Sequence, residues 1–113
     1  RVTLNNDPTA HAEVEAVRDA CSNSKDFSLS GATLYVSCEP CPMCMAASYW
    51  ARLDRVVYAA SRGDAAAAGF DDGLIAREMQ LLPDERSLKT VRLDVDSSSP
   101  FRKWKEKSDK VSY

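Results

Sequence analysis

Hydrophobic positions near the start of the chain recur at the spacing of a helix. Four of them lie three or four residues apart and give the segment one apolar face: Ala10, Val14, Val17 and Cys21. Asp7 is a helix-capping residue type and Pro8 suits a first helical position, so we predict that the helix begins there. It is predicted to end near residues 22–26.

The rest of the chain alternates between strand and helix patterns. In chain order, the predicted elements are a strand at 32–37, a helix beginning at Pro42, a strand at 55–60, a loop with one short helical turn at 61–73, a helix at 74–82, a strand at 88–95 and a final helix after 97–100 with Phe101 and Trp104 on its apolar side. This alternation indicates an α/β fold, in which parallel strands are joined by helical crossovers.

Length and composition are those of one ordinary globular domain. The 113 residues suffice for a single domain spanning 1–113. No apolar run reaches the length of a membrane span and no signal pattern is visible, so we expect a cytoplasmic protein with no membrane partner. A formal charge of −2 disfavours nucleic acid as a partner. Because the sequence begins at Arg1 without a methionine, we expect the domain to be N-terminally incomplete.

Three cysteines are spaced two residues apart in the segment CEPCPMC, at Cys38, Cys41 and Cys44. Such a cluster, in a chain with no secretory signal, favours reduced thiols that bind metal. Because the prolines mark a helix start, the thiols lie near the positive end of the helix dipole, which favours thiolate. An iron–sulfur cluster is excluded, since its fourth cysteine would fall at Ser48. A thioredoxin-like redox pair fits the spacing and stays open.

The only histidine completes a zinc motif. HAE followed by PCPMC matches the H-x-E…P-C-x-x-C signature of zinc deaminases. We therefore predict that Zn²⁺ is held by His11, Cys41 and Cys44, which leaves one position open for water as in catalytic sites. Glu13 is predicted as the general acid and base. A structural zinc module with Cys38 as a fourth ligand remains the alternative.

Longer segments carry a resemblance to a known family. They are NDPTAHAEV (6–14), LYVSCEPCPMC (34–44), YWARLDRVVYAA (49–60), AAAAGFDD (65–72) and the terminal Tyr113. On these segments the chain resembles the cytidine deaminase-like superfamily, and more narrowly its bacterial guanine deaminases. The resemblance implies a three-layer α/β/α fold with a central mixed sheet and helices on both faces. In the family, an N-terminal helix and a strand hairpin precede the HAE helix, and both are missing here.

The same resemblance implies an activity and further site residues. The activity is zinc-dependent hydrolytic deamination of guanine to xanthine and ammonia, in purine catabolism or salvage. Asp72 is implied as a catalytic and base-binding carboxylate, whereas Asp71 is expected to cap the following helix. The other implied base-binding residues are Ala12, Trp50, Phe70 and Tyr113. We expect a homodimer with one Zn²⁺ per subunit, and exchange of the C-terminal segment between subunits is an option that some relatives use.

Related deaminases are the nearest rivals to this interpretation. tRNA adenosine deaminases share HAE and PCxxC, and other nucleobase or nucleoside deaminases belong to the same superfamily. An enzyme that acts on tRNA should carry a basic face for phosphates. The basic segment at 101–110 is interrupted by Glu106 and Asp109, so a solvated helix face is the better interpretation.

Overall fold

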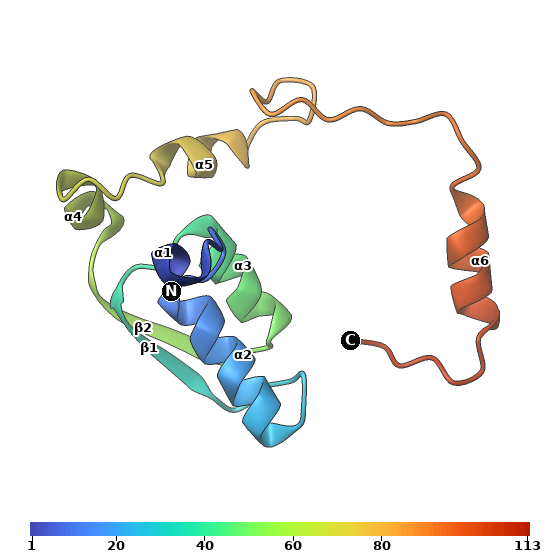
Figure 1. The fold of residues 1–113 in the computed structure, drawn as a ribbon, viewed down its shortest axis with the longest axis horizontal. Coiled ribbons are helices and arrows are strands. Elements are labelled where there is room, and N and C mark those ends of the chain that lie inside the picture. Colours follow the sequence, from blue (N-terminus) through green and yellow to red (C-terminus); the bar gives the residue numbers. More distant parts are fainter. The chain divides into compact units, whose positions relative to one another are not determined.

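The computed structural model describes residues 1–113 and divides into two compact units, Arg1–Leu81 and Leu82–Tyr113. The first unit contains α1 (Val2–Asn5), α2 (Ala12–Ser24), β1 (Thr33–Cys38), α3 (Pro42–Trp50), β2 (Arg55–Ala60), α4 (Arg62–Ala67) and α5 (Gly73–Glu78), as Figure 1 shows. The second unit contains α6 (Ser98–Glu106). A single domain over 1–113 therefore stays a prediction. None of the helices is both long and apolar enough to cross a membrane.

A two-stranded parallel sheet forms the frame of the first unit. The register runs from Thr33 opposite Arg55 to Cys38 opposite Ala60, and α3 makes the crossover between the strands. The pairing extends one residue further, because the N–H of Glu39 donates to the carbonyl of Ala60 at 2.8 Å. The predicted parallel pair with a helical crossover is thus confirmed. Both strands end at the same edge of the sheet, which is where α/β folds commonly place ligands.

The core of this unit lies where α2 contacts α3. Its buried residues are mostly small: Ala10, Val14, Cys44, Ser48 and Ala51. The hydroxyl of Ser48 donates to the carbonyl of Cys44 at 2.9 Å, which satisfies the one buried polar side chain. Small residues at the contact allow the two helices to approach closely. Two of these buried residues, Ala10 before α2 and Cys44 in the first turn of α3, lie near the helix starts.

The predicted start of the first long helix at Pro8 is wrong. Asp7 Oδ1 accepts the N–H of Thr9 at 2.8 Å and its hydroxyl at 2.7 Å. This local turn uses the carboxylate that a helix cap at Asp7 would need. The helix α2 therefore begins four residues later, at Ala12, and its N-cap is His11.

The helix α4 occupies a segment for which the sequence predicts a loop with one short turn. Two caps explain it. Ser61 and Asp64 form a reciprocal capping box at its start. At its end, the N–H of Gly69 donates to Ala66 and that of Phe70 to Ala65, the pattern of a Schellman motif. The next helix, predicted at 74–82, is shorter and ends at Glu78.

The second unit lacks the predicted strand at 88–95. This segment has the alternating pattern of a strand, but no second strand is present in this unit to pair with it. An unpaired strand has no stable form of its own. The predicted final helix is confirmed as α6, yet none of its residues is buried, and Phe101 is 69% exposed.

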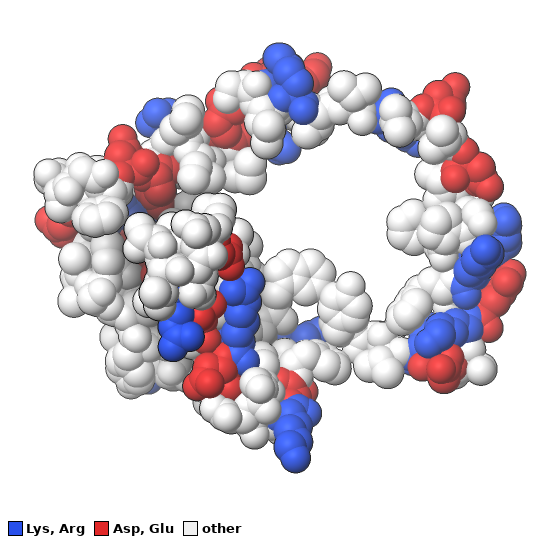
Figure 2. Space-filling view, viewed as in Figure 1, with Lys and Arg blue, Asp and Glu red and all other residues white.

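Surface charges of opposite sign lie beside one another. On α2, Arg18 pairs with Glu15 at 3.0 Å and with Asp7 at 3.8 Å. Figure 2 shows the same interleaving of basic and acidic side chains over the visible face, with no continuous basic patch on it.

Candidate active site

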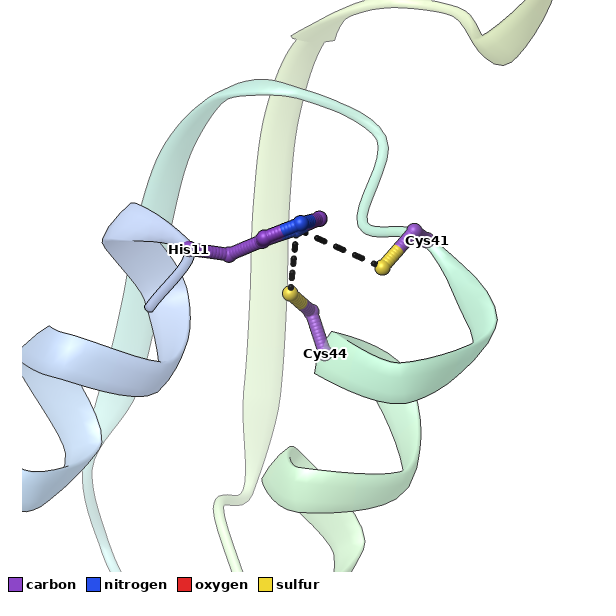
Figure 3. A group of neighbouring side chains, drawn as sticks. All are labelled: His11, Cys41 and Cys44. Carbon is purple, nitrogen blue, oxygen red and sulfur yellow. Dashed lines mark hydrogen bonds between the residues drawn. The ribbon is translucent and has the colours of Figure 1, made fainter. Parts of the chain in front are cut away.

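His11, Cys41 and Cys44 converge at the start of two helices. The Nδ1 atom of His11 lies 3.6 Å from Cys41 Sγ and 3.5 Å from Cys44 Sγ. Figure 3 shows the imidazole directed toward both thiols, with His11 at the start of α2 and the cysteines at the start of α3. The convergence of a histidine on the two thiols favours a metal site over a redox pair.

Helix starts explain why these side chains are free to bind a metal. His11 is the N-cap of α2 and Cys41 is the N-cap of α3, both with extended backbone angles. Neither side chain caps its own helix, so each is available for other contacts. Pro42 occupies the first helical position of α3 and fixes its φ angle. Cys44 follows in the same turn and is fully buried.

The three donors fit zinc. All three ligand atoms lie within 4.8 Å of one another. In a tetrahedral zinc site, bonds of about 2.3 Å to sulfur and about 2.0 Å to nitrogen place these atoms roughly 3.5 Å apart. The two nitrogen–sulfur distances agree with that value. One imidazole and two thiols are ligands that Zn²⁺ prefers, and three of them leave a fourth position for water.

The thiol of Cys44 depends on a metal to ionise. Burial raises its pKa far above the ordinary value, and the neighbouring Cys41 and the Glu13 carboxylate add to the effect. The thiolate that the sequence predicts from the helix dipole is therefore disfavoured at Cys44 without a metal. A metal cation reverses this balance, because a coordinating thiol is deprotonated outright.

Cys38 does not belong to this group. Its thiol contacts the carbonyl of Ser61 at 3.6 Å, across the ends of β1 and β2. A structural zinc module would need Cys38 as its fourth ligand, but Cys38 is not part of the group of metal donors. The site retains the open position of a catalytic centre.

A cavity of about 510 Å³ lies beside the three donors. Its zinc side consists of His11, Glu13, Cys38, Glu39 and Cys41. Its α4–α5 side consists of Arg62, Ala65, Gly69, Phe70, Asp71, Asp72 and Ile75. The zinc side supplies a carboxylate next to the metal donors, and the α4–α5 side supplies an aromatic ring and further charged groups.

The position of Glu13 is explained by the extended backbone at His11. Residues two apart on a helix do not share a face. His11 precedes the helix, however, and only Glu13 lies within it, at the second helical position. Both side chains consequently line the same cavity.

The structure brings some of the predicted base-binding residues to the cavity and not others. Phe70 and Asp72 line it. Ala12 does not, and instead lines a neighbouring hollow between α2 and β1. Trp50 lies at the opposite end of α3 from the cysteines and is 67% exposed, so this chain does not bring it to the cavity. Tyr113 belongs to the second unit, and its role stays a prediction.

Two charged residues of the cavity have no counterpart among the predicted site residues. Arg62 donates from Nε to Asp72 Oδ1 at 3.0 Å, and its backbone N–H donates to Glu39 Oε2 at 3.1 Å. The Ser61-x-x-Asp64 pattern could have predicted a helix start around Arg62. No sequence pattern predicts its partner. Asp71 caps α5 as expected, accepting the N–H of the second residue after it at 2.7 Å.

Comparisons with known proteins agree with this geometry. Residues 1–60 match the model of the cytidine and deoxycytidylate deaminase zinc-binding region. The chain is 47% identical to the guanine deaminase of Bacillus subtilis (strain 168) over 113 residues, which is 99% of this chain and 72% of that protein. It is 42% identical to the tRNA-specific adenosine deaminase of Haemophilus influenzae over 74 residues, which is 61% of this chain and 43% of that protein.

A solved structure confirms the predicted fold class. The X-ray structure of guanine deaminase from Bacillus subtilis matches the chain with a TM-score of 0.96 and 47% identity, covering 99% of this chain and 72% of that one. The chain therefore shares the α/β fold of that structure.

Proposed function

Because the chain belongs to the cytidine and deoxycytidylate deaminase zinc-binding family and is a zinc-dependent deaminase, we propose that its substrate is guanine, which it converts to xanthine and ammonia. The observation that carries this proposal is the cavity itself. An acidic side chain and an aromatic ring, Asp72 and Phe70, line it together with the zinc donors. The likeness to a guanine deaminase over 99% of the chain supports the same substrate.

The zinc side would carry the chemistry. His11, Cys41 and Cys44 would hold Zn²⁺, whose Lewis acidity makes water a nucleophile near neutral pH. Glu13 takes a proton from the attacking water and donates it to the ring nitrogen beside the carbon that bears the amino group. Glu13 would then take the remaining proton from the added hydroxyl and pass it to the amino group. The carbon–nitrogen bond breaks as the hydroxyl oxygen becomes the carbonyl of xanthine, and the amino group leaves as ammonia. One carboxylate can serve these steps because it alternates between its ionised and protonated forms.

The α4–α5 side would bind the base. Guanine presents N–H donors along its reacting edge, and an ionised carboxylate such as Asp72 can only accept hydrogen bonds. Asp72 would also relay a proton during departure of the amino group. The ring of Phe70, which lines the cavity, would pack against the flat purine. Tyr113 is proposed as a further contact to the base, supported by the likeness that extends over 99% of the chain.

A homodimer is part of the same proposal. Large apolar side chains of the second unit are exposed, among them Phe101, Trp104 and Tyr113. Exposed apolar groups of this number favour an interface. Exchange of the C-terminal segment between subunits would cover them and would bring Tyr113 to a cavity. We further propose that the protein is cytoplasmic and acts in purine catabolism or salvage.

A tRNA adenosine deaminase is the second candidate, because the Haemophilus influenzae enzyme of that name is 42% identical over 74 residues. Two observations weigh against it. That likeness covers 61% of the chain, whereas the guanine deaminase covers 99%. The visible face in Figure 2 also lacks the continuous basic surface that a phosphate backbone favours.

The experiment that tests the proposal is ammonia release by the zinc-loaded protein from guanine, guanosine, adenine, cytosine, cytidine and tRNA, each supplied alone. We expect guanine to be turned over fastest. Release from tRNA alone, or from a pyrimidine in preference to guanine, would overturn the assignment of the substrate.

A further inference from the structure

We propose that Arg62 is a positioning residue that orients Asp72 toward the base and thereby sets the preference for guanine. This inference rests on the proposed function. It starts from the ion pair between Arg62 Nε and Asp72 Oδ1, which is 3.0 Å long. Both residues line the cavity beside the zinc donors.

The ion pair is sheltered and uses one side of the carboxylate. The side chains of Arg62 and Asp72 are 34% and 21% exposed, so the pair is less screened by solvent than an ordinary surface pair. Arg62 occupies Oδ1. The second oxygen, Oδ2, takes no part in this hydrogen bond and can accept N–H groups of the base.

Arg62 is itself anchored to the edge of the sheet that carries the zinc side. Its backbone N–H donates to Glu39 Oε2 at 3.1 Å. Glu39 follows β1 directly, and its own N–H pairs with Ala60 at the end of β2. The capping box between Ser61 and Asp64 fixes the first turn of α4, in which Arg62 is the first residue. The guanidinium therefore extends from a fixed point toward Asp72.

Packing alone does not hold Asp72 in place. Neither α4 nor α5 has a buried residue. Asp72 is the N-cap of α5, yet its side chain makes no capping hydrogen bond, because Asp71 takes that role. The contact with Arg62 is the polar link between its carboxylate and the rest of the cavity. Losing it should free the carboxylate to rotate.

An oriented carboxylate would discriminate between purines. The edge of guanine that reacts carries N–H donors on the ring and on the amino group, and both can face Oδ2 of Asp72. Adenine has a ring nitrogen acceptor beside its amino group, which would face the carboxylate with no hydrogen between them. A site built around an acceptor rejects such a base because the buried groups are left unpaired. A carboxylate free to rotate would reject it less well.

The test measures coupling between Arg62 and Asp72. Affinity for labelled guanine or adenine would be measured by equilibrium dialysis in the inactive Glu13→Gln protein. The kcat/KM for ammonia release would be measured in protein that retains Glu13. We expect Arg62→Gln to weaken guanine binding and kcat/KM about tenfold or more, as misplaced binding groups do. The ratio of guanine to adenine affinity should fall, while zinc content stays unchanged. Arg62→Lys should recover much of the loss.

The decisive arm is the double variant. In an Asp72→Asn background, Arg62→Gln should cause little further loss, because Arg62 acts through that carboxylate. Arg55→Gln, an exposed arginine at the start of β2 outside the cavity, is the matched control and should leave every readout unchanged. Equal losses from Arg62→Gln in both backgrounds would overturn the inference. If unaltered protein releases no ammonia from guanine, the proposed function fails instead, so the two failures are distinguishable.

Discussion

The two sides of the cavity are built in different ways. On the zinc side, the ligands lie at the starts of α2 and α3, where Ala10 and Cys44 are buried. On the α4–α5 side no helix has a buried residue, and helix caps and the ion pair of Arg62 with Asp72 hold the segment. On the proposed function, metal binding would thus depend on packing, whereas recognition of the base would depend on polar contacts. Changes on the α4–α5 side should alter substrate preference without loss of zinc.

Removing a zinc ligand should have the largest effect of all the changes. This effect, the loss of bound zinc, should arise only from changes on the zinc side. We expect Cys44→Ser to weaken zinc affinity by more than about a hundredfold, since loss of even an outer-shell partner costs about ten- to a hundredfold. Turnover should be lost with the metal. Zinc per polypeptide and competition with a chelator would measure this.

Cys38→Ser is the matched control for the ligand variant. Its thiol contacts the carbonyl of Ser61 and lies outside the donor group. We expect it to retain zinc and activity. Equal loss of zinc from both variants would contradict the assignment of three ligands.

Changing the carboxylate of the α4–α5 side should affect turnover and not the metal. Asp72→Asn exchanges an acceptor for a partial donor, and we expect kcat/KM for guanine to fall by about 10² or more. Zinc content should be unchanged. Asp71→Asn, one residue away, changes another residue of the cavity lining, but its carboxylate already accepts the N–H of Gly73, so its effect should be much smaller. If the two neighbours matter equally, the specific role of Asp72 is refuted.

Backbone strain on the α4–α5 side should have a moderate effect. Gly69 ends α4 with a φ of +93°, and Gly69→Ala should cost about 1–2 kcal/mol of stability in this left-handed region. We expect a higher KM for guanine with zinc retained. Gly63→Ala lies inside the helix, where a Cβ would meet Ser61 Oγ at 3.5 Å, an ordinary contact. In thermal unfolding, the midpoint temperature of Gly69→Ala should be lower than that of Gly63→Ala. The reverse order would contradict the role of the cap.

The capping box of α4 should give the smallest effect, visible as a pH dependence. The hydroxyl and backbone N–H of Ser61 hold the pKa of Asp64 below its ordinary value of 3.8. A lowered pKa in the folded protein means that this contact stabilises the fold above pH 3.8. That contribution is lost as the pH falls through the lower, folded value. An NMR titration should find the Asp64 midpoint below 3.8, and Ser61→Ala should raise it; an unchanged midpoint would show that the contact is absent.

Sequence patterns predicted the zinc side well because its parts are local. The motifs HAE and PCPMC each place a metal-binding residue type directly before a helix, His11 before α2 and Cys41 before α3. The strands on either side of α3 are short apolar runs. The α4–α5 side was harder to predict from the sequence, because the contact between Arg62 and Asp72 joins residues ten apart with no characteristic spacing. The strand predicted at 88–95 failed because pairing depends on a neighbour, which a local pattern does not contain. The start of α2 was misplaced because Asp7 can serve either a helix or a turn.

The most direct test of the whole account is Glu13→Gln, assayed for zinc content and for ammonia release from guanine in the same preparation. Because Glu13 lies beside the donors without being one of them, we expect one zinc per polypeptide and no measurable turnover. Turnover close to that of the unaltered protein would contradict the account, and so would the loss of zinc.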